Sequence, residues 1–498
     1  MVARFRGLFD PDEKVSSEGL HKGLRAIIWD GMCTQAMGAL CGGAFLVAFA
    51  LDLGASNFHI GFLAAIPFLA QLLQLPAVYL VEKVRARRFI CVTFSGVSRL
   101  FWLLIAAIPL LFAAHHGMGL YLLIAALFLF AGLGAVSGTS WNSWMRDLIP
   151  PKILGRFFSR RMMWAIGLGL VLTLLGGVFA DFWKGGFPGD EIYAYSILFA
   201  FGCGAGLLGL YFLSRTPEPK MEQNVEVPSL GQLLLRPLKD ANFRRLLLFN
   251  VPWSFAINLA APFFTVYLLV RLEFSLSMVV MLTVLSQLAN LFFLPIWGRL
   301  SDRFSNKSVL AVSGPLFLLC ILAWIFTTMP EKYFLTLPLV FAIHMFSGIS
   351  LAGVTLGGGN IALKLSPQGQ ATSYLAANGL LNSIAAGAAC LIGGSIGFFF
   401  ATKELSIYAI YLRGLDFLFV IAFLIGLYSI HHLASVTEEG EVTERIVIRE
   451  LTAEVAQQMK SLSTVGGLRL LTSLPLYVAR HSLRRLPQPR KGKNLSPG

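Results

Sequence analysis

The feature that most limits what this chain can fold into is a series of long, unbroken apolar runs. One of them, LYLLIAALFLFAGLGAV at residues 120–136, holds no charged residue and no regular alternation of apolar and polar positions. A membrane-crossing helix needs about 20 apolar residues, whereas a strand of a membrane barrel alternates apolar and polar side chains over about ten. The runs therefore predict membrane-spanning helices and exclude a barrel.

The composition excludes soluble and disordered chains. Of the 498 residues, 56% are hydrophobic and 13% are charged, whereas an ordinary soluble domain has about 25% charged residues. Disordered chains are poor in aromatic residues, which make up 12% here. We expect an all-α membrane protein with twelve spans, near 27–51, 57–81, 89–112, 118–139, 161–182, 192–213, 246–270, 276–299, 308–329, 335–357, 375–400 and 407–430.

The distribution of basic residues predicts the topology. The chain has 40 Lys and Arg residues and a net charge of +14, and most of them fall on one side of the expected spans. Positive charge flanking membrane helices marks the cytoplasmic side, so this charge needs no nucleic-acid partner. We expect a multi-pass protein of the cell inner (plasma) membrane with both termini in the cytoplasm. The opposite side holds only Lys184, Arg271, Lys332, Lys403 and Arg413.

An internal repeat divides the chain. A shift of 220 residues places Asp30 on Asn250 and Glu82 on Asp302, without a gap across two spans. Repeats of this kind are typical of transporters built from two six-helix halves. The expected units are an N-terminal bundle at 1–213, a cytoplasmic linker at 214–245, a C-terminal bundle at 246–434 and a cytoplasmic tail at 435–498. The tail contains an amphipathic, charged stretch and then a basic one, which favours contact with anionic membrane lipids or, alternatively, a partner protein.

Three segments resemble the major facilitator superfamily. The segment WGRLSDRFSNKSVL at 297–310 is similar to the family's loop between spans 8 and 9, roughly G-x-L-x-D-R-x-G-R-K. Its first-half counterpart, VYLVEKVRARR at 78–88, keeps the charges but has Val78 at the glycine position. The segments 141–161 and 216–219 (TPEP) resemble the loops after spans 4 and 6. The resemblance implies the fold of this family, a secondary transporter working by alternating access, and a cytoplasmic gate.

The gate that the resemblance implies lies at the cytoplasmic ends of equivalent helices in the two halves. Charged groups there can form contacts that hold this side shut and break on opening. The alternative is that these charges only anchor the topology. The gate candidates are Gly298, Asp302, Arg303 and Lys307 in the second half, and Glu82, Lys83 and Arg87 in the first.

Polar residues inside the spans are the candidates for binding substrate or a coupling ion. An ionisable side chain within the bilayer is expensive and suggests function. Arg99, deep in the third expected span, favours an anionic substrate, and the alternative is a static pair with Asp30. Asn and Gln also hydrogen-bond helices together, and a lone His is more often a packing residue. The full set is Asp30, Gln35, Arg99, Asn250, Trp253, Asn258, Gln287, Asn290, His344, Asn378 and Asn382.

The sequence favours a transporter of a small solute over two alternatives. Motifs typical of hydrolases, metalloproteases and nucleotide-binding enzymes do not occur, so we expect no enzymatic activity, cofactor or metal site. A scaffold or receptor on the same fold is the second alternative. The sequence leaves open the substrate, the direction of transport, and whether H⁺ or Na⁺ drives symport or antiport.

The predicted topology can be tested with single cysteines. We expect a cysteine at position 225 in the linker to react only with reagents that reach the cytoplasm, because basic residues crowd that side. The test is labelling of intact cells with a membrane-impermeant maleimide. Reaction at position 225 from outside would contradict the topology.

Overall fold

A computed structural model describes residues 11, 15–112, 116–150, 153–221, 237–329, 331–367, 371–407 and 410–463. Within these residues, twelve helices are long and apolar enough to cross a membrane, as the sequence predicted. The distal basic part of the tail and residues 222–236 of the predicted linker lie outside the described residues.

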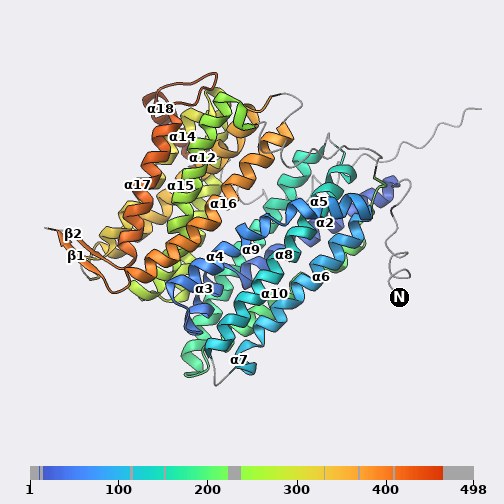
Figure 1. The fold of residues 1–498 in the computed structure, drawn as a ribbon, viewed down its shortest axis with the longest axis horizontal. Coiled ribbons are helices and arrows are strands. Elements are labelled where there is room, and N and C mark those ends of the chain that lie inside the picture. Colours follow the sequence, from blue (N-terminus) through green and yellow to red (C-terminus); the bar gives the residue numbers. More distant parts are fainter. Residues whose placement is uncertain are drawn as a thin grey trace, which may run out of the picture.

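The N-terminal half contains six spans, two of which are broken (Figure 1). The first span breaks at Gly42, and Gly43 follows with φ +55°, a left-handed conformation that glycine adopts without steric cost. The elements are α2 (Ser17–Cys41) and α3 (Gly43–Asp52), α4 (Asn57–Gln71) and α5 (Gln74–Val84), α6 (Arg87–Ala106), the short α7 (Ile108–Leu111), α8 (His116–Leu148), α9 (Leu154–Gly186) and α10 (Tyr193–Ser214).

The C-terminal half repeats this order and adds a hairpin and a tail helix. Its first helix begins at Ala241, earlier than the expected residue 246, and Asp240 caps it through bonds from the N–H groups of Asn242 and Phe243. The elements are α12 (Ala241–Val266) with η3 (Tyr267–Arg271), α13 (Leu276–Arg303), α14 (Asn306–Ala323) with η4 (Trp324–Thr327), α15 (Thr336–Lys364), α16 (Ala371–Phe399), β1 (Glu404–Ile407), β2 (Ile410–Arg413), α17 (Leu415–Leu433) and α18 (Glu444–Ser463).

The expected start of the twelfth span at residue 407 was wrong. Strands β1 and β2 pair antiparallel here, with Glu404 opposite Arg413, and the helix begins at Leu415. The β-branched and aromatic residues of this segment suit a strand. The Arg413 guanidinium lies 3.0 Å from Glu404, and only its backbone N–H donates to Asp416.

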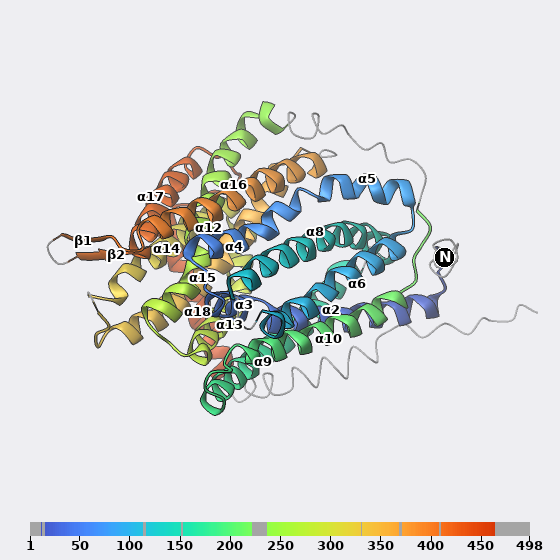
Figure 2. The same cartoon turned by 60° about the horizontal axis from the view of Figure 1, so that its bottom comes forward.

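The two halves meet near one end of the molecule. We call the end with the hairpin and α7 the hairpin side, and the end with the linker the linker side (Figures 1 and 2). The contacts between the halves join α3, α4 and α9 to α12, α13 and α16, whereas α5, the linker-side part of the second span, packs against α6 and α8 of its own half.

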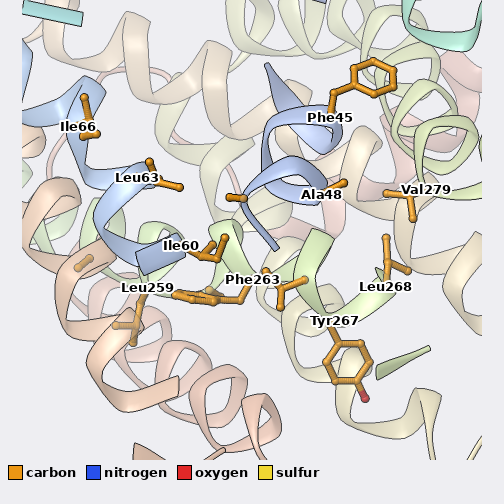
Figure 3. Packing of buried hydrophobic residues seen from close by; sticks show 14 of the residues in the cluster. Phe45, Ala48, Ile60, Leu63, Ile66, Leu259, Phe263, Tyr267, Leu268 and Val279 are labelled. Atoms are coloured by element: carbon orange, nitrogen blue, oxygen red, sulfur yellow. The ribbon is translucent and has the colours of Figure 1, made fainter. Parts of the chain in front are cut away.

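Buried apolar side chains form most of this junction. Figure 3 shows Ile60 of α4 near Leu259 and Phe263 of α12, and Ala48 of α3 on the side of Val279 of α13. Glycines let α4 and α16 approach closely, because a Cβ on Gly61 would lie only 2.7 Å from the Gly394 Cα. Such contacts depend on small residues, as is common between membrane helices.

Two polar contacts also cross the junction. The Asp181 carboxylate on α9 accepts hydrogen bonds from the N–H groups of Leu276 (3.2 Å) and Ser277 (2.9 Å) at the start of α13. The Asn57 amide donates to the Gly397 carbonyl at 3.0 Å. A carboxylate at a helix N-terminus is favoured by the unpaired N–H groups and the helix dipole, so Asp181 ties α13 to the N-terminal half.

We expect Asp181→Ala to loosen the hairpin side. It removes charge-assisted hydrogen bonds worth about 1.5–3 kcal/mol, enough to raise the hairpin-side-open population about tenfold. Spin-label distances between cysteines at positions 185 and 398 measure this opening. The control is Asp190→Ala, an exposed acid on the same side. Identical distance distributions in the two variants would contradict the role of Asp181.

Candidate functional site

A cavity of 630 Å³ lies within the N-terminal half. Residues from α2, α4, α5, α6, α8 and α9 line it, and they are mostly apolar or small. Its charged lining residues are Asp30, Arg99 and Arg161, and its apolar ones include Leu63, Ile66, Trp102, Leu127 and Phe130.

Asp30 and Arg99 form a buried ion pair. Arg99 Nη2 lies 3.6 Å from Asp30 Oδ1, and the side chains are 7% and 5% exposed. Arg99 also donates to the Thr34 hydroxyl at 3.0 Å and to the Gly206 carbonyl. Arg99 therefore bonds to residues of its own half. This is the static pair with Asp30 that the sequence analysis gave as the alternative to an anion site.

Arg161 is a member of this cluster that sequence analysis missed. Sequence analysis places it at the edge of the span expected at 161–182 and in the loop-like segment 141–161, whereas α9 begins at Leu154 and carries Arg161 into the bundle. Its Nη2 lies 3.7 Å from Asp30 Oδ2, and its Nε donates to the Ile27 carbonyl at 3.2 Å. The guanidinium stacks over Trp141, 5.0 Å from the ring centroid. The signal in the sequence was the apolar run that continues directly from Arg161.

Arg161 also differs from Arg99 in its accessibility. Its side chain is 22% exposed, and neither Nη1 nor Nη2 donates a hydrogen bond to any residue that the structure describes. Two guanidinium groups and one carboxylate give the cluster a net charge of +1 in its ionised form. The cluster can therefore bind an anion through Arg161 while Asp30 and Arg99 hold each other in place.

The polar stripe of α12 pairs with α16. The Asn250 amide donates to Asn378 Oδ1 at 3.0 Å, and the Ser254 hydroxyl donates to the Asn382 carbonyl at 3.1 Å. The Asn258 amide bonds to the Ser254 carbonyl of its own helix. Most of these groups hydrogen-bond two helices together, which the sequence analysis gave as the alternative to binding substrate.

The other candidate residues lie apart from the cluster. Trp253 is buried between Phe249 and Phe317. His344 bonds to the Val340 carbonyl and packs edge-on against Trp324, as a packing histidine would. Gln35 and Gln287 border a separate cavity of 160 Å³ between the halves. The Asn290 side chain has no hydrogen-bond partner in the described part of the chain.

Arg87, a predicted gate residue, lies in a buried clasp within its own half. Both Glu218 oxygens accept backbone N–H groups at the start of α6, from Arg87 at 2.6 Å and Arg88 at 2.9 Å. The Arg87 side chain is 0% exposed and pairs with Glu218 and Asp147. Burial raises the pKa of the Glu218 carboxyl, and the donors from Arg87 and Arg88 oppose this rise.

Lys307 lies in the equivalent clasp of the other half. Glu438 accepts the N–H groups of Asn306 at 3.2 Å and Lys307 at 2.7 Å, at the start of α14. The Lys307 ammonium bonds to Glu441 at 2.8 Å. Glu218 and Glu438 are themselves 220 residues apart, so the repeat extends to these clasps. Sequence analysis missed both glutamates, although TPEP contains the first.

The remaining gate candidates make no contact that the structure shows between the halves. Asp302 and Lys83 are exposed, and Arg303 pairs with Glu450 of the tail helix at 2.7 Å. The Glu82 carbonyl accepts a bond from Arg85. A Cβ on Gly298 would lie 3.7 Å from Leu356, an ordinary contact. The expected close helix approach at Gly298 is therefore absent from the described structure, and the gate stays a prediction.

Comparisons with known proteins give a family. The profile of the Major Facilitator Superfamily matches residues 31–390. No curated protein sequence matches the chain.

Solved structures of transporters share the fold. The nucleoside transporter NupG matches with a TM-score of 0.60 and 11% identity over 84% of this chain and 98% of that one. The inward-open xylose transporter XylE from E. coli matches with a TM-score of 0.59 and 14% identity, over 87% of this chain and 99% of that one. A bacterial homologue of the human lysosomal transporter Spinster, inward-facing and unoccupied, matches with a TM-score of 0.57 and 15% identity. The match covers 87% of this chain and 99% of that one.

We expect Glu218→Ala to destabilise the N-terminal half. It leaves the buried Arg87 with one carboxylate partner fewer and exposes unpaired N–H groups at the start of α6, and breaking a buried pair costs about 3–5 kcal/mol. The measurement is thermal unfolding of the purified protein by intrinsic fluorescence. The control, Glu439→Ala, removes an exposed glutamate. Equal melting temperatures for the two variants would rule out a stabilising clasp.

Proposed function

The chain belongs to the major facilitator superfamily, and from this premise we propose that it carries a small organic anion, bound at the Asp30–Arg99–Arg161 cluster. Membership of this family and twelve candidate spans make it a multi-pass secondary transporter of a small solute rather than an enzyme. The anion and its site are the proposal, and the N-terminal cavity supports them.

The observation that carries the proposal is the environment of Arg161. This guanidinium lines the cavity, has two nitrogens without a hydrogen-bond partner among the described residues, and belongs to a cluster with one excess positive charge. Arginine presents a planar set of donors that matches a carboxylate. The apolar side chains that line much of the cavity favour an organic body over an inorganic ion or a sugar.

The arrangement of the halves supports transport by alternating access. They are joined on the hairpin side through the apolar junction, Asp181 and Asn57, and the linker-side ends of the spans pack within their own halves. We assign the linker side to the cytoplasm because basic residues concentrate there. In this assignment the contacts that join the halves lie on the outer side, as expected of an inward-facing state, and two of the similar solved structures are inward-facing.

The exchange of states requires the hairpin-side contacts to break while contacts form on the linker side. Asp30 positions both guanidinium groups, and because Arg161 lies on α9 with Asp181, movement of α9 would change the cluster and the junction together. Substrate at Arg161 would thereby favour one state over the other.

The proposal can be tested with benzoate as an organic anion and benzamide as its uncharged counterpart. We expect purified protein in proteoliposomes to take up labelled benzoate but not benzamide. Arg161→Gln should reduce benzoate uptake tenfold or more, because a charge-assisted hydrogen bond is worth about 1.5–3 kcal/mol. Arg161→Lys should retain part of the uptake.

The control variant is Lys184→Gln, which removes a cation near the hairpin side that pairs only loosely with Asp52, at 3.8 Å. Uptake by this variant should stay close to that of the unmodified chain. Uptake of xylose or uridine in preference to benzoate would overturn the anion assignment. Full benzoate uptake by Arg161→Gln would place the site elsewhere.

A further inference from the structure

Helix α18 lies across the linker-side ends of α13 and α14 (Figure 1). Val447, fully buried, packs with Ile296, Trp297, Leu300 and Val309. This apolar contact fixes the position of an otherwise charged helix. The structure therefore resolves the first part of the tail as a docked element of the C-terminal half.

The segment 438–454 is acidic, with six Glu against Arg445 and Arg449, and its carboxylates lie beside basic residues of the C-terminal half. Arg299 pairs with Glu454 at 2.8 Å and Arg303 with Glu450 at 2.7 Å. The two remaining pairs, Lys307 with Glu441 at 2.8 Å and Lys364 with Glu438 at 3.0 Å, belong to the clasp region. Four cations at the linker-side rim of the C-terminal half thus have carboxylate partners from the segment 438–454.

The facing rim of the N-terminal half is also basic. Lys83 and Arg85 at the end of α5, Arg146 at the end of α8 and Arg156 at the start of α9 are all exposed. Nearby Asp147 already pairs with the buried Arg87. This rim therefore presents an excess of positive charge.

Closing the linker side brings the two rims together. Helices α9 and α13 already touch on the hairpin side, so closure would bring their linker-side ends together. The end of α9 carries Arg156, and the end of α13 carries Arg299 and Arg303. Like charges repel at these separations, and salt screens them. Bare basic rims would therefore oppose the closed state that every transport cycle needs.

We propose that the acidic segment 438–454 is a counter-charge that permits closure: its Glu450 and Glu454 neutralise the rim of the C-terminal half and make it compatible with the basic rim facing it. This goes beyond substrate binding, since it concerns the balance between the two states. The proposed effect is electrostatic, so the net charge of the rim, and not any single ion pair, determines how readily the linker side closes.

The test uses spin-label distances across the linker side, between cysteines at positions 159 and 376, in the full-length protein. The six native cysteines are buried and can stay in place. Glu450→Gln with Glu454→Gln should raise the linker-side-open population roughly threefold, as expected for two exposed ion pairs. Salt at about 1 M, where the Debye length is about 3 Å, should return this variant toward the unmodified distribution.

A compensated variant separates counter-charge from docking. Replacing Arg299, Arg303, Glu450 and Glu454 together by Gln removes both ion pairs but leaves the net charge of the rim unchanged. We expect the unmodified distance distribution. If the tail acts only through these specific pairs, the compensated variant should open at least as far as the double variant, and the proposal falls.

The control for lost negative charge is Asp190→Asn with Glu331→Gln, two exposed acids remote from the linker side. It should leave the linker-side distances unchanged. Opening by this control, no opening by Glu450→Gln with Glu454→Gln, or opening of that variant that salt does not reverse would each overturn the proposal. The measurement uses no substrate, so its result is independent of the anion assignment.

Discussion

The Asp30 carboxylate is the interaction on which the proposed site depends. It lies between two guanidinium groups inside a bundle of membrane helices, where unpaired charge is costly. By pairing with Arg99 on α6 and approaching Arg161 on α9, it joins three helices of the N-terminal half. Both terminal nitrogens of Arg99 contact its own half, and Arg161 keeps part of its capacity to bind. One residue thus serves mainly to hold the structure and the other is the candidate contact for substrate.

The same physical constraint explains the ends of the helices. A buried helix start leaves N–H groups that need acceptors, and glutamates that follow the last span of each half supply them. Glu218 does so for α6 and Glu438 for α14. Across the junction, Asp181 supplies the same kind of acceptor to α13. The first two contacts lie within a half and can persist through the cycle, whereas the third joins the halves and has to break.

The number of spans could be predicted from the sequence because each membrane helix is a continuous apolar run. The division into halves followed from a repeat that preserves charged positions at helix ends. The pairing of Arg99 with Asp30 was foreseen as one alternative, since a buried charge needs a partner and few were available.

Features that depend on long-range geometry were missed. Arg161 follows a run of basic residues, so local charge favoured a loop, although α9 continues through it. The strand pair β1 and β2 is apolar enough to be mistaken for the start of a span. The clasp between Glu438 and Asn306 joins positions far apart in the chain, and no local pattern specifies it. Both topology and the gate stay predictions, because the described contacts place the gate candidates only within their own halves.

The most direct test of the account is electron cryo-microscopy of the full-length protein with 4-iodobenzoate, whose iodine marks the ligand's orientation. The account predicts the carboxylate within hydrogen-bonding distance of the Arg161 guanidinium, with the ring toward Trp102 and Phe130. Ligand bound only against the polar stripe of α12 and α16, at Asn250 and Asn382, would contradict it.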